Sequence, residues 1–95
     1  MPRIKMSDLP EEGIIELPET PILLARFKGV LTALESTCTH KACNVAFGEI
    51  LGSDIVCPCH GSKFDLITGE VKGGPATMPL KKHNVRILGD DIFVD

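Results

Sequence analysis

The sequence contains no run of basic residues and no long hydrophobic stretch. Its 95 residues carry a net charge of −3, so the composition gives no electrostatic support for binding nucleic acid or an anionic membrane. The longest apolar runs are short, as from Ile22 to Ala25, whereas a helix that spans a bilayer needs about 20 apolar residues. We therefore expect no membrane span and no nucleic-acid partner.

The N-terminal segment MPRIKMSDLPEEG also lacks the apolar region of a secretory signal. This absence predicts a soluble, cytoplasmic protein. A fragment trimmed from a membrane-anchored subunit is the less favoured alternative, because the chain starts at Met1 and runs directly into strand-like sequence.

Convincing helical patterns, internal repeats, low-complexity segments and linkers are missing as well. Short strand-like segments instead alternate with turns that contain Gly, Pro and Asp, which is typical of an antiparallel β-sandwich or barrel. We expect one all-β domain over residues 1–95. The expected strands cover residues 3–6, 13–17, 22–27, 30–36, 47–51, 55–57, 63–65, 70–72, 84–88 and 92–94.

Cysteine and histidine gather in two short motifs. The first is Cys38-Thr39-His40, and the second is Cys57-Pro58-Cys59-His60, with sixteen residues between His40 and Cys57. Each motif offers a thiolate and an imidazole at close spacing, so two loops can chelate one metal centre. Thiolates favour a soft or borderline metal, and imidazoles raise its reduction potential relative to an all-thiolate site. The third histidine, His83, lies outside both motifs and is expected to be an ordinary surface residue.

Three kinds of site use these residue types. A structural zinc site accepts two Cys and two His, but it usually pairs the two Cys in one motif and the two His in the other. A catalytic Cys–His pair would leave the second pair unexplained. A 2Fe-2S cluster with two His on one iron needs two Cys and two His, and is the favoured interpretation.

The motifs CTHKAC and CPCHGS, the latter followed by KFD, resemble the two cluster-binding loops of Rieske iron–sulfur proteins. The close resemblance covers roughly residues 36–80. It implies a Rieske-type fold with a small cluster-binding subdomain, at about residues 37–76, that is built from two loops. It also implies that Cys38 and Cys57 ligate the inner iron of one 2Fe-2S cluster, and that His40 and His60 ligate the outer iron.

The remaining cysteines, Cys43 and Cys59, match an additional pair found in the Rieske subunits of quinol-oxidising respiratory and photosynthetic complexes. The resemblance implies that a disulfide joins them. Ferredoxins of ring-hydroxylating dioxygenase systems are similar in size to this chain but typically lack that pair. The alternative is two free buried thiols, which a reducing cytosol would favour.

The resemblance also implies roles for residues that are not ligands. Ser62 matches a serine whose hydroxyl donates to a bridging sulfide, and Phe64 stands where the members of highest potential carry Tyr. Lys41 occupies a position where respiratory subunits often carry Leu, a departure that speaks against quinol docking. Gly74 and Pro75 resemble a Pro-containing loop that covers the cluster, although a simple turn also explains them.

The expected function is that of a monomeric one-electron carrier, not an enzyme, which passes electrons between a reductase and a terminal oxidoreductase. Its protein donor and acceptor are expected to dock near His40 and His60. The second hypothesis is a small, non-catalytic subunit of an oxidoreductase complex of the dioxygenase, arsenite oxidase or quinol oxidase type. The third is an interaction module stabilised by zinc.

Overall fold

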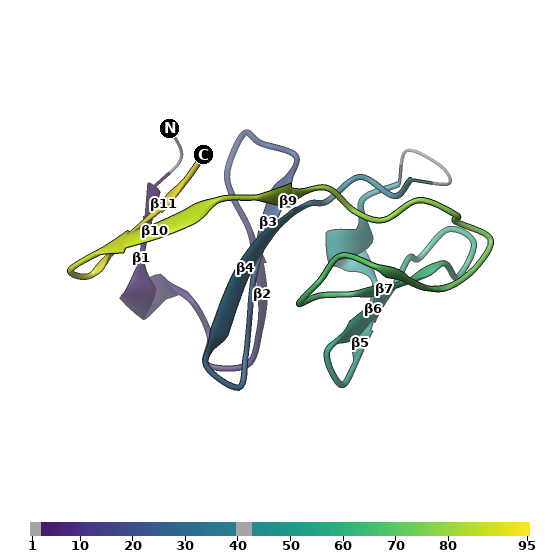
Figure 1. The fold of residues 1–95 in the computed structure, drawn as a ribbon, viewed down its shortest axis with the longest axis horizontal. Coiled ribbons are helices and arrows are strands. Elements are labelled where there is room, and N and C mark those ends of the chain that lie inside the picture. Colours follow the sequence, from purple (N-terminus) through teal and green to yellow (C-terminus); the bar gives the residue numbers. More distant parts are fainter. Residues whose placement is uncertain (1–2, 40–42) are drawn as a thin grey trace.

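Three antiparallel sheets follow one another along the long axis of the molecule (Figure 1). The structure, a computed structural model, describes residues 3–39 and 43–95 and measures 39 × 25 × 18 Å. The first sheet contains β1 (Arg3–Lys5), β11 (Asp91–Val94) and β10 (Val85–Leu88). The middle sheet contains β2 (Gly13–Glu16), β3 (Ile22–Phe27), β4 (Val30–Glu35) and β9 (Lys82–His83). The third contains β5 (Glu49–Leu51), β6 (Asp54–Val56), β7 (Lys63–Asp65) and β8 (Val71–Gly73).

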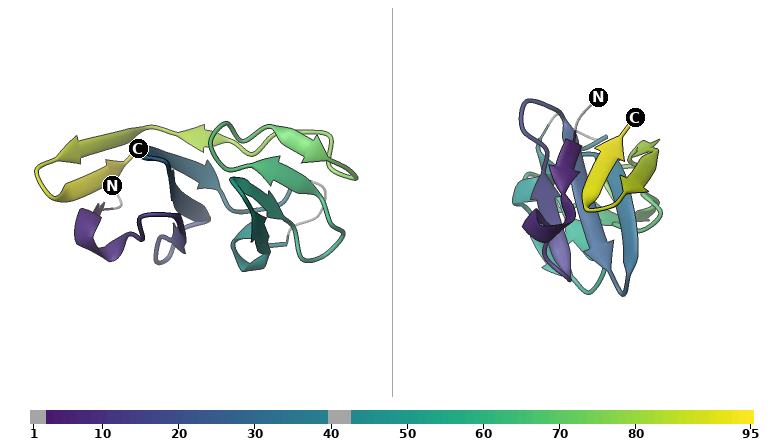
Figure 2. Two further views of the ribbon diagram at one scale, coloured as in Figure 1. Left: turned by 90° about the horizontal axis from the view of Figure 1, so that it is seen from below. Right: turned by 90° about the vertical axis from the view of Figure 1, so that its left-hand side faces the viewer.

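Both faces of the middle sheet are buried, which explains the apolar run in β3. Successive side chains of a strand point to opposite faces. Leu23 therefore joins an apolar cluster shared with the third sheet, whereas Leu24 joins a cluster shared with Ile92 and Val94 of β11. Leu23 and Leu24 are both fully buried. The left view in Figure 2, from below, shows the same succession of the three sheets.

The predicted antiparallel all-β architecture is confirmed, and the bounds of nine of the ten expected strands differ by at most one residue from those observed. The exception is the segment expected at 47–51, whose strand begins at Glu49. A 3₁₀-helix, η2 (Val45–Phe47), occupies its start, and the side chain of Asn44 accepts a hydrogen bond of 2.8 Å from the N–H of Ala46. A second 3₁₀-helix, η1 (Met6–Asp8), follows β1. None of the helices in the described residues has the length and apolar character needed to cross a bilayer.

Sequence analysis missed β9, and its interpretation of His83 was wrong. A strand of two residues is too short to show an alternating pattern in the sequence. It is a strand because its backbone pairs with β4. The pairing leaves the His83 side chain only 16% exposed. Its Nε2 lies 3.5 Å from a Glu35 carboxylate oxygen, and its Nδ1 lies 3.1 Å from the backbone oxygen of Asp95. His83 is thus packed where the middle sheet meets the end of the chain.

The third sheet is an insertion between two neighbouring strands of the middle sheet. β4 and β9 are hydrogen-bonded partners, yet residues 36–81 lie between them in the sequence. The N–H of Glu35 donates to the carbonyl of Lys81 at 2.8 Å and closes the base of the insertion. The cluster-binding part expected at residues 37–76 falls within this insertion, and its division from the rest of a single domain stays a prediction.

Replacing Gly48 with Ala tests how tightly the inserted sheet is packed. A Cβ at Gly48 would overlap the carbonyl oxygen of Val56, and backbone cannot move aside as a flexible side chain can. We expect Gly48→Ala to lower the free energy of unfolding by about 1–3 kcal/mol, measured by chemical denaturation. Gly73→Ala is the matched control, because its Cβ would lie 3.4 Å from that of Lys63, an ordinary contact. Equal losses in the two variants would contradict the expected clash.

Candidate metal centre

Two thiols lie side by side in the apolar cluster between the middle and third sheets. Cys38 follows β4 and is 4% exposed, and Cys57 directly follows β6 and is 2% exposed. The other two cysteines form a disulfide, so Cys38 and Cys57 remain as thiols. Each of the two sequence motifs therefore contributes one buried cysteine, and the two side chains are neighbours.

Opposing effects act on the charge of the buried Cys57 sulfur, and burial is the largest of them. Burial raises the pKa of the Cys57 thiol, and its hydrogen bond and charge interaction with Cys38 raise that pKa further. The backbone N–H groups of Cys59 and His60 act in the opposite direction, because they donate to the sulfur. A thiolate is the form that binds metal. These residues fit a thiolate-ligated metal centre, since two buried sulfurs are close together and N–H groups already balance part of the negative charge.

A tight turn carries the chain from Cys57 to Ser62, here named the second loop (residues 57–62). The N–H of Gly61 donates to the carbonyl of Cys57 at 3.0 Å, and the N–H of Cys57 donates to the carbonyl of Ser62 at 2.7 Å. Gly61 has a φ of +77°, a conformation that other residues rarely adopt. The turn buries the thiol of Cys57 and leaves His60 exposed. One motif thus offers a ligand on the inside and another at the surface.

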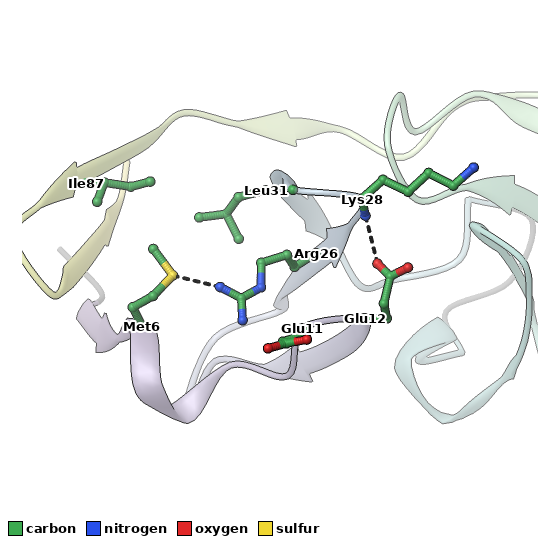
Figure 3. Close-up of a pocket in the computed structure, with 8 residues that line it drawn as sticks. Met6, Glu11, Glu12, Arg26, Lys28, Leu31 and Ile87 are labelled. Atoms are coloured by element: carbon green, nitrogen blue, oxygen red, sulfur yellow. Dashed lines mark hydrogen bonds between the residues drawn. The ribbon is translucent and has the colours of Figure 1, made fainter.

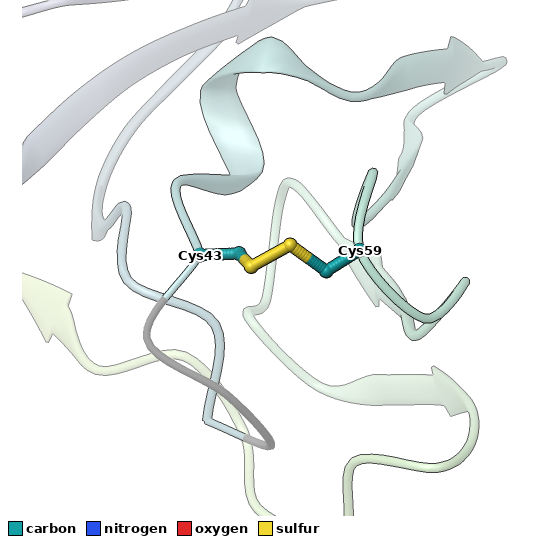
Figure 4. The surroundings of a disulfide bond; sticks show 2 residues. All are labelled: Cys43 and Cys59. Carbon is teal, nitrogen blue, oxygen red and sulfur yellow. A yellow bond between two sulfur atoms is a disulfide. The ribbon is translucent and has the colours of Figure 1, made fainter.

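The disulfide joins the second loop to the first loop (residues 36–44, described at 36–39 and 43–44). Cys43 and Cys59 are linked, with their Cα atoms 6.4 Å apart (Figure 4). The N–H of Cys38 donates to the carbonyl of Cys43 at 2.8 Å, so the thiol and the crosslink are held in one loop. The structure therefore contains the disulfide that the resemblance implied, in place of two free thiols.

A third segment (residues 74–81) lies against both loops. The N–H of Ala76 donates to Oγ of Ser62 at 3.0 Å, and both residues are buried. The hydroxyl of Thr39 donates to the carbonyl of Met78 at 2.6 Å. The sequence did not predict the second contact, because its partners are 39 positions apart and no local pattern marks it.

The other residues predicted from the sequence have different positions. Phe64 is fully buried and belongs to the same apolar cluster as the two thiols. Gly74 and Pro75 begin the third segment, are exposed, and share a cis peptide bond. His40 and Lys41 lie outside the described residues. Within the part of the chain that is described, no three His, Cys, Asp or Glu side chains converge on a single ion.

A cleft of about 550 Å³ lies outside the two loops and the third segment (Figure 3). It contains no cysteine or histidine among its lining residues, and the Arg26 guanidinium crosses it. Arg26 donates to the carbonyls of Leu9 and Pro10 and to the sulfur of Met6. These bonds join β3 to η1 and to the segment that follows it. Arg26 therefore has a structural role in connecting these parts of the chain.

Comparison with known proteins shows which family the sequence matches. A family model described as Rieske [2Fe-2S] domain matches residues 1–84. The chain is 37% identical over 92 residues to the cytochrome b6-f complex iron-sulfur subunit of Chlorobaculum thiosulfatiphilum, covering 95% of this chain and 50% of that subunit. The chain thus spans about half the length of that relative.

Shorter relatives match over most of their length. The ferredoxin component of biphenyl 2,3-dioxygenase from Rhodococcus jostii (strain RHA1) is 36% identical over 85 residues, which cover 90% of this chain and 75% of that protein. A chain from a solved complex of reduced oxygenase and oxidized ferredoxin in carbazole 1,9a-dioxygenase has a TM-score of 0.85 and 28% identity. That comparison covers 100% of both chains.

Removing the disulfide with the pair Cys43→Ser and Cys59→Ser should lower the free energy of unfolding. The bridge closes a loop with a sequence separation of 16, for which chain entropy predicts about 3 kcal/mol. Denaturant unfolding of the native and double-variant proteins measures the difference. As a control, excess dithiothreitol should bring the native protein to the stability of the double variant. Free thiols titrated at Cys43 and Cys59 in the folded, oxidised protein would contradict the bridge.

Proposed function

The chain belongs to the Rieske [2Fe-2S] domain family, and we propose that it binds its 2Fe-2S cluster with Cys38 and Cys57 on the inner iron and His40 and His60 on the outer iron. The observation that carries this assignment is the pair of adjacent, buried thiols, each from one of the two motifs. The exposed position of His60 in the second loop supports an outer iron near the surface. His40 is assigned from the sequence alone.

The ferredoxin components and iron-sulfur subunits that this chain resembles are electron carriers rather than catalysts. When bound, a 2Fe-2S cluster would supply storage of one electron, at a higher potential than an all-cysteine centre because neutral imidazoles would replace two thiolates. The chain supplies the surroundings. Cys38 and Cys57 hold the inner side away from water, and the N–H groups of Cys59 and His60 stabilise negative charge on the Cys57 sulfur. On the outer side, exposed His60 gives the electron a short path to a partner.

We propose that the protein is a free carrier between a reductase and a terminal oxidoreductase. The ferredoxin component of biphenyl 2,3-dioxygenase, which this chain matches over 75% of its length, supports that role. We propose that the donor and acceptor dock near His40 and His60; the exposure of His60 in the second loop supports this, and His40 is included from the sequence alone. The monomeric state and the cytoplasmic location expected from the sequence stay predictions.

A subunit of a larger oxidoreductase complex is the second candidate. Two observations favour it: the 37% identity to a cytochrome b6-f subunit and the disulfide between the loops. Purification from the native host separates the two candidates, because a free carrier elutes alone and a subunit elutes with its complex.

Replacing His60 with Cys tests the ligand assignment. If a cluster still assembles, we expect a lower reduction potential, since a thiolate adds negative charge to the centre. Voltammetry measures the potential, and iron and acid-labile sulfide analysis with electron paramagnetic resonance identifies the cluster. His83→Cys is the matched control, because His83 lies in β9 outside the motifs and should leave the potential unchanged. Native protein that contains zinc and no sulfide would instead support the zinc-stabilised module.

Replacing Phe64 with Tyr tests whether this ring lies beside a cluster sulfur. Phe64 is fully buried among residues that include Cys38 and Cys57, so a new hydroxyl needs a partner, and a thiolate sulfur can accept its hydrogen bond. The bond should favour the more negative, reduced state and raise the potential. A difference of about 1 kcal/mol between the two redox states corresponds to ~40 mV.

The matched control for this variant is Phe27→Tyr. Phe27 belongs to the same apolar cluster and is 7% exposed, but it pairs with Val30 at the end of β4 that is farther from Cys38. Its hydroxyl should leave the potential unchanged. An unchanged potential in Phe64→Tyr, with the hydroxyl shown to point to solvent, would mean that the ring is not aligned with a cluster sulfur.

A further inference from the structure

Three contacts tie the first loop, the second loop and the third segment to one another in pairs. The disulfide Cys43–Cys59 joins the two loops. Ser62 joins the second loop to the third segment through Ala76, and Thr39 joins the first loop to the third segment through Met78. Each of the three segments is therefore connected to both of the others, and two of them carry the buried thiols of Cys38 and Cys57.

We infer that Thr39 is a positioning residue whose hydroxyl keeps the third segment closed over the metal centre when the Cys43–Cys59 disulfide is reduced. The inference rests on the cluster site proposed above. Thr39 itself stands between the proposed ligands Cys38 and His40, and its side chain is directed to the backbone of Met78, not to either buried thiol.

The middle of the third segment depends on this hydrogen bond. At its start, the N–H of Ala76 is bonded to Ser62, and near its end, the N–H of Leu80 donates to the carbonyl of Gly69 at 2.8 Å. Between them, Met78 is 64% exposed, and Pro79 has no N–H to donate. The hydrogen bond from Thr39 holds the carbonyl of Met78, in the middle of this stretch.

The contribution of Thr39 should depend on the state of the disulfide. While Cys43 and Cys59 are linked, loss of the Thr39 bond leaves all three segments connected through the disulfide and Ser62. Reduction of the disulfide by a dithiol takes two electrons and two protons, forms two thiols, and leaves the reductant as a disulfide. The hydrogen bond between Cys38 and Cys57 then still joins the first loop to the second loop, and the bond from Thr39 is the one of the three contacts that joins the first loop to the third segment.

The contribution of the Thr39–Met78 hydrogen bond depends on the state of the disulfide because this hydrogen bond is exposed to solvent. Water competes for the Thr39 hydroxyl and the Met78 carbonyl, so the bond contributes little while a covalent link already fixes the loops. Once the link is open, the bond also resists separation of the first loop from the third segment, and its loss exposes the buried thiols to solvent. A solvent-exposed hydroxyl thereby becomes important in a reducing environment.

The test compares Thr39→Val, which replaces the hydroxyl with a methyl group of similar size, with Thr39→Ser, which keeps a hydroxyl. Each is made in the native sequence and in the Cys43→Ser, Cys59→Ser background. Two rates are measured at one pH: loss of the visible absorbance of the cluster, and hydrogen exchange of the amides in residues 76–80. Thr20→Val is the matched control, because Thr20 also donates to a carbonyl, that of Leu17, but within a turn outside these segments.

In the double-serine background, Thr39→Val should speed both rates by about three- to tenfold, the range that the loss of one hydrogen bond gives. With the disulfide intact it should change them by less than about twofold, since the covalent link remains. Thr39→Ser should restore the slow rates, and Thr20→Val should change neither rate in either background. Equal effects of Thr39→Val in the two backgrounds, or failure of Thr39→Ser to restore the slow rates, would overturn the inference.

Hydrogen exchange separates this inference from the proposed function. Native protein without iron and sulfide would refute the cluster, but exchange at residues 76–80 would still be measured in the metal-free chain. In the metal-free chain, faster exchange in Thr39→Val that appears only after reduction of the disulfide supports the inferred role of the Thr39–Met78 hydrogen bond. Unchanged exchange overturns it, whether or not a cluster is present.

Discussion

Burial of β3 on both of its faces is the packing constraint on which the rest of this small protein depends. A chain of this length cannot build a large core, and a strand that packs on both sides serves two small ones. Leu23 faces the inserted sheet and Leu24 faces the first sheet, so the two clusters share one backbone. The thiols of Cys38 and Cys57 belong to the first of these clusters. The proposed metal centre is thus packed against the same strand that stabilises the opposite end of the molecule.

The candidate metal centre combines two environments that a single loop could not supply. Burial next to Cys38 disfavours a charge on the Cys57 sulfur, while the N–H groups of Cys59 and His60 favour it. Exposure of His60, three residues after a buried cysteine, requires the tight turn at Gly61. The inner side of the site is therefore dry and held by the apolar cluster, and the outer side is open to a partner. This division suits a protein that must protect a metal centre and still exchange an electron.

Much of the fold could be predicted from the sequence because strand ends coincide with turn residues. The segment from Ile22 to Phe27 shows this, since its bounds match those of β3. The two motifs and the resemblance they carry led to the disulfide between Cys43 and Cys59. The contacts that organise the loops could not be predicted, because Thr39 and Met78 are distant in sequence and meet only in the folded chain. Likewise, His83 is covered because a two-residue strand pairs with β4, which no local pattern reveals.

The pairing of β4 with β9 determines where the inserted region is attached to the middle sheet. Its two ends leave the middle sheet from neighbouring strands, and the bond from Glu35 to Lys81 fixes the distance between them. An insertion anchored in this way can differ in length without shifting the register of β2, β3 and β4, as long as it still covers the face of β3 that carries Leu23. The inserted region, residues 36–81, therefore obeys two separate constraints: its ends must meet at neighbouring strands, and its apolar face must match the sheet on which it lies.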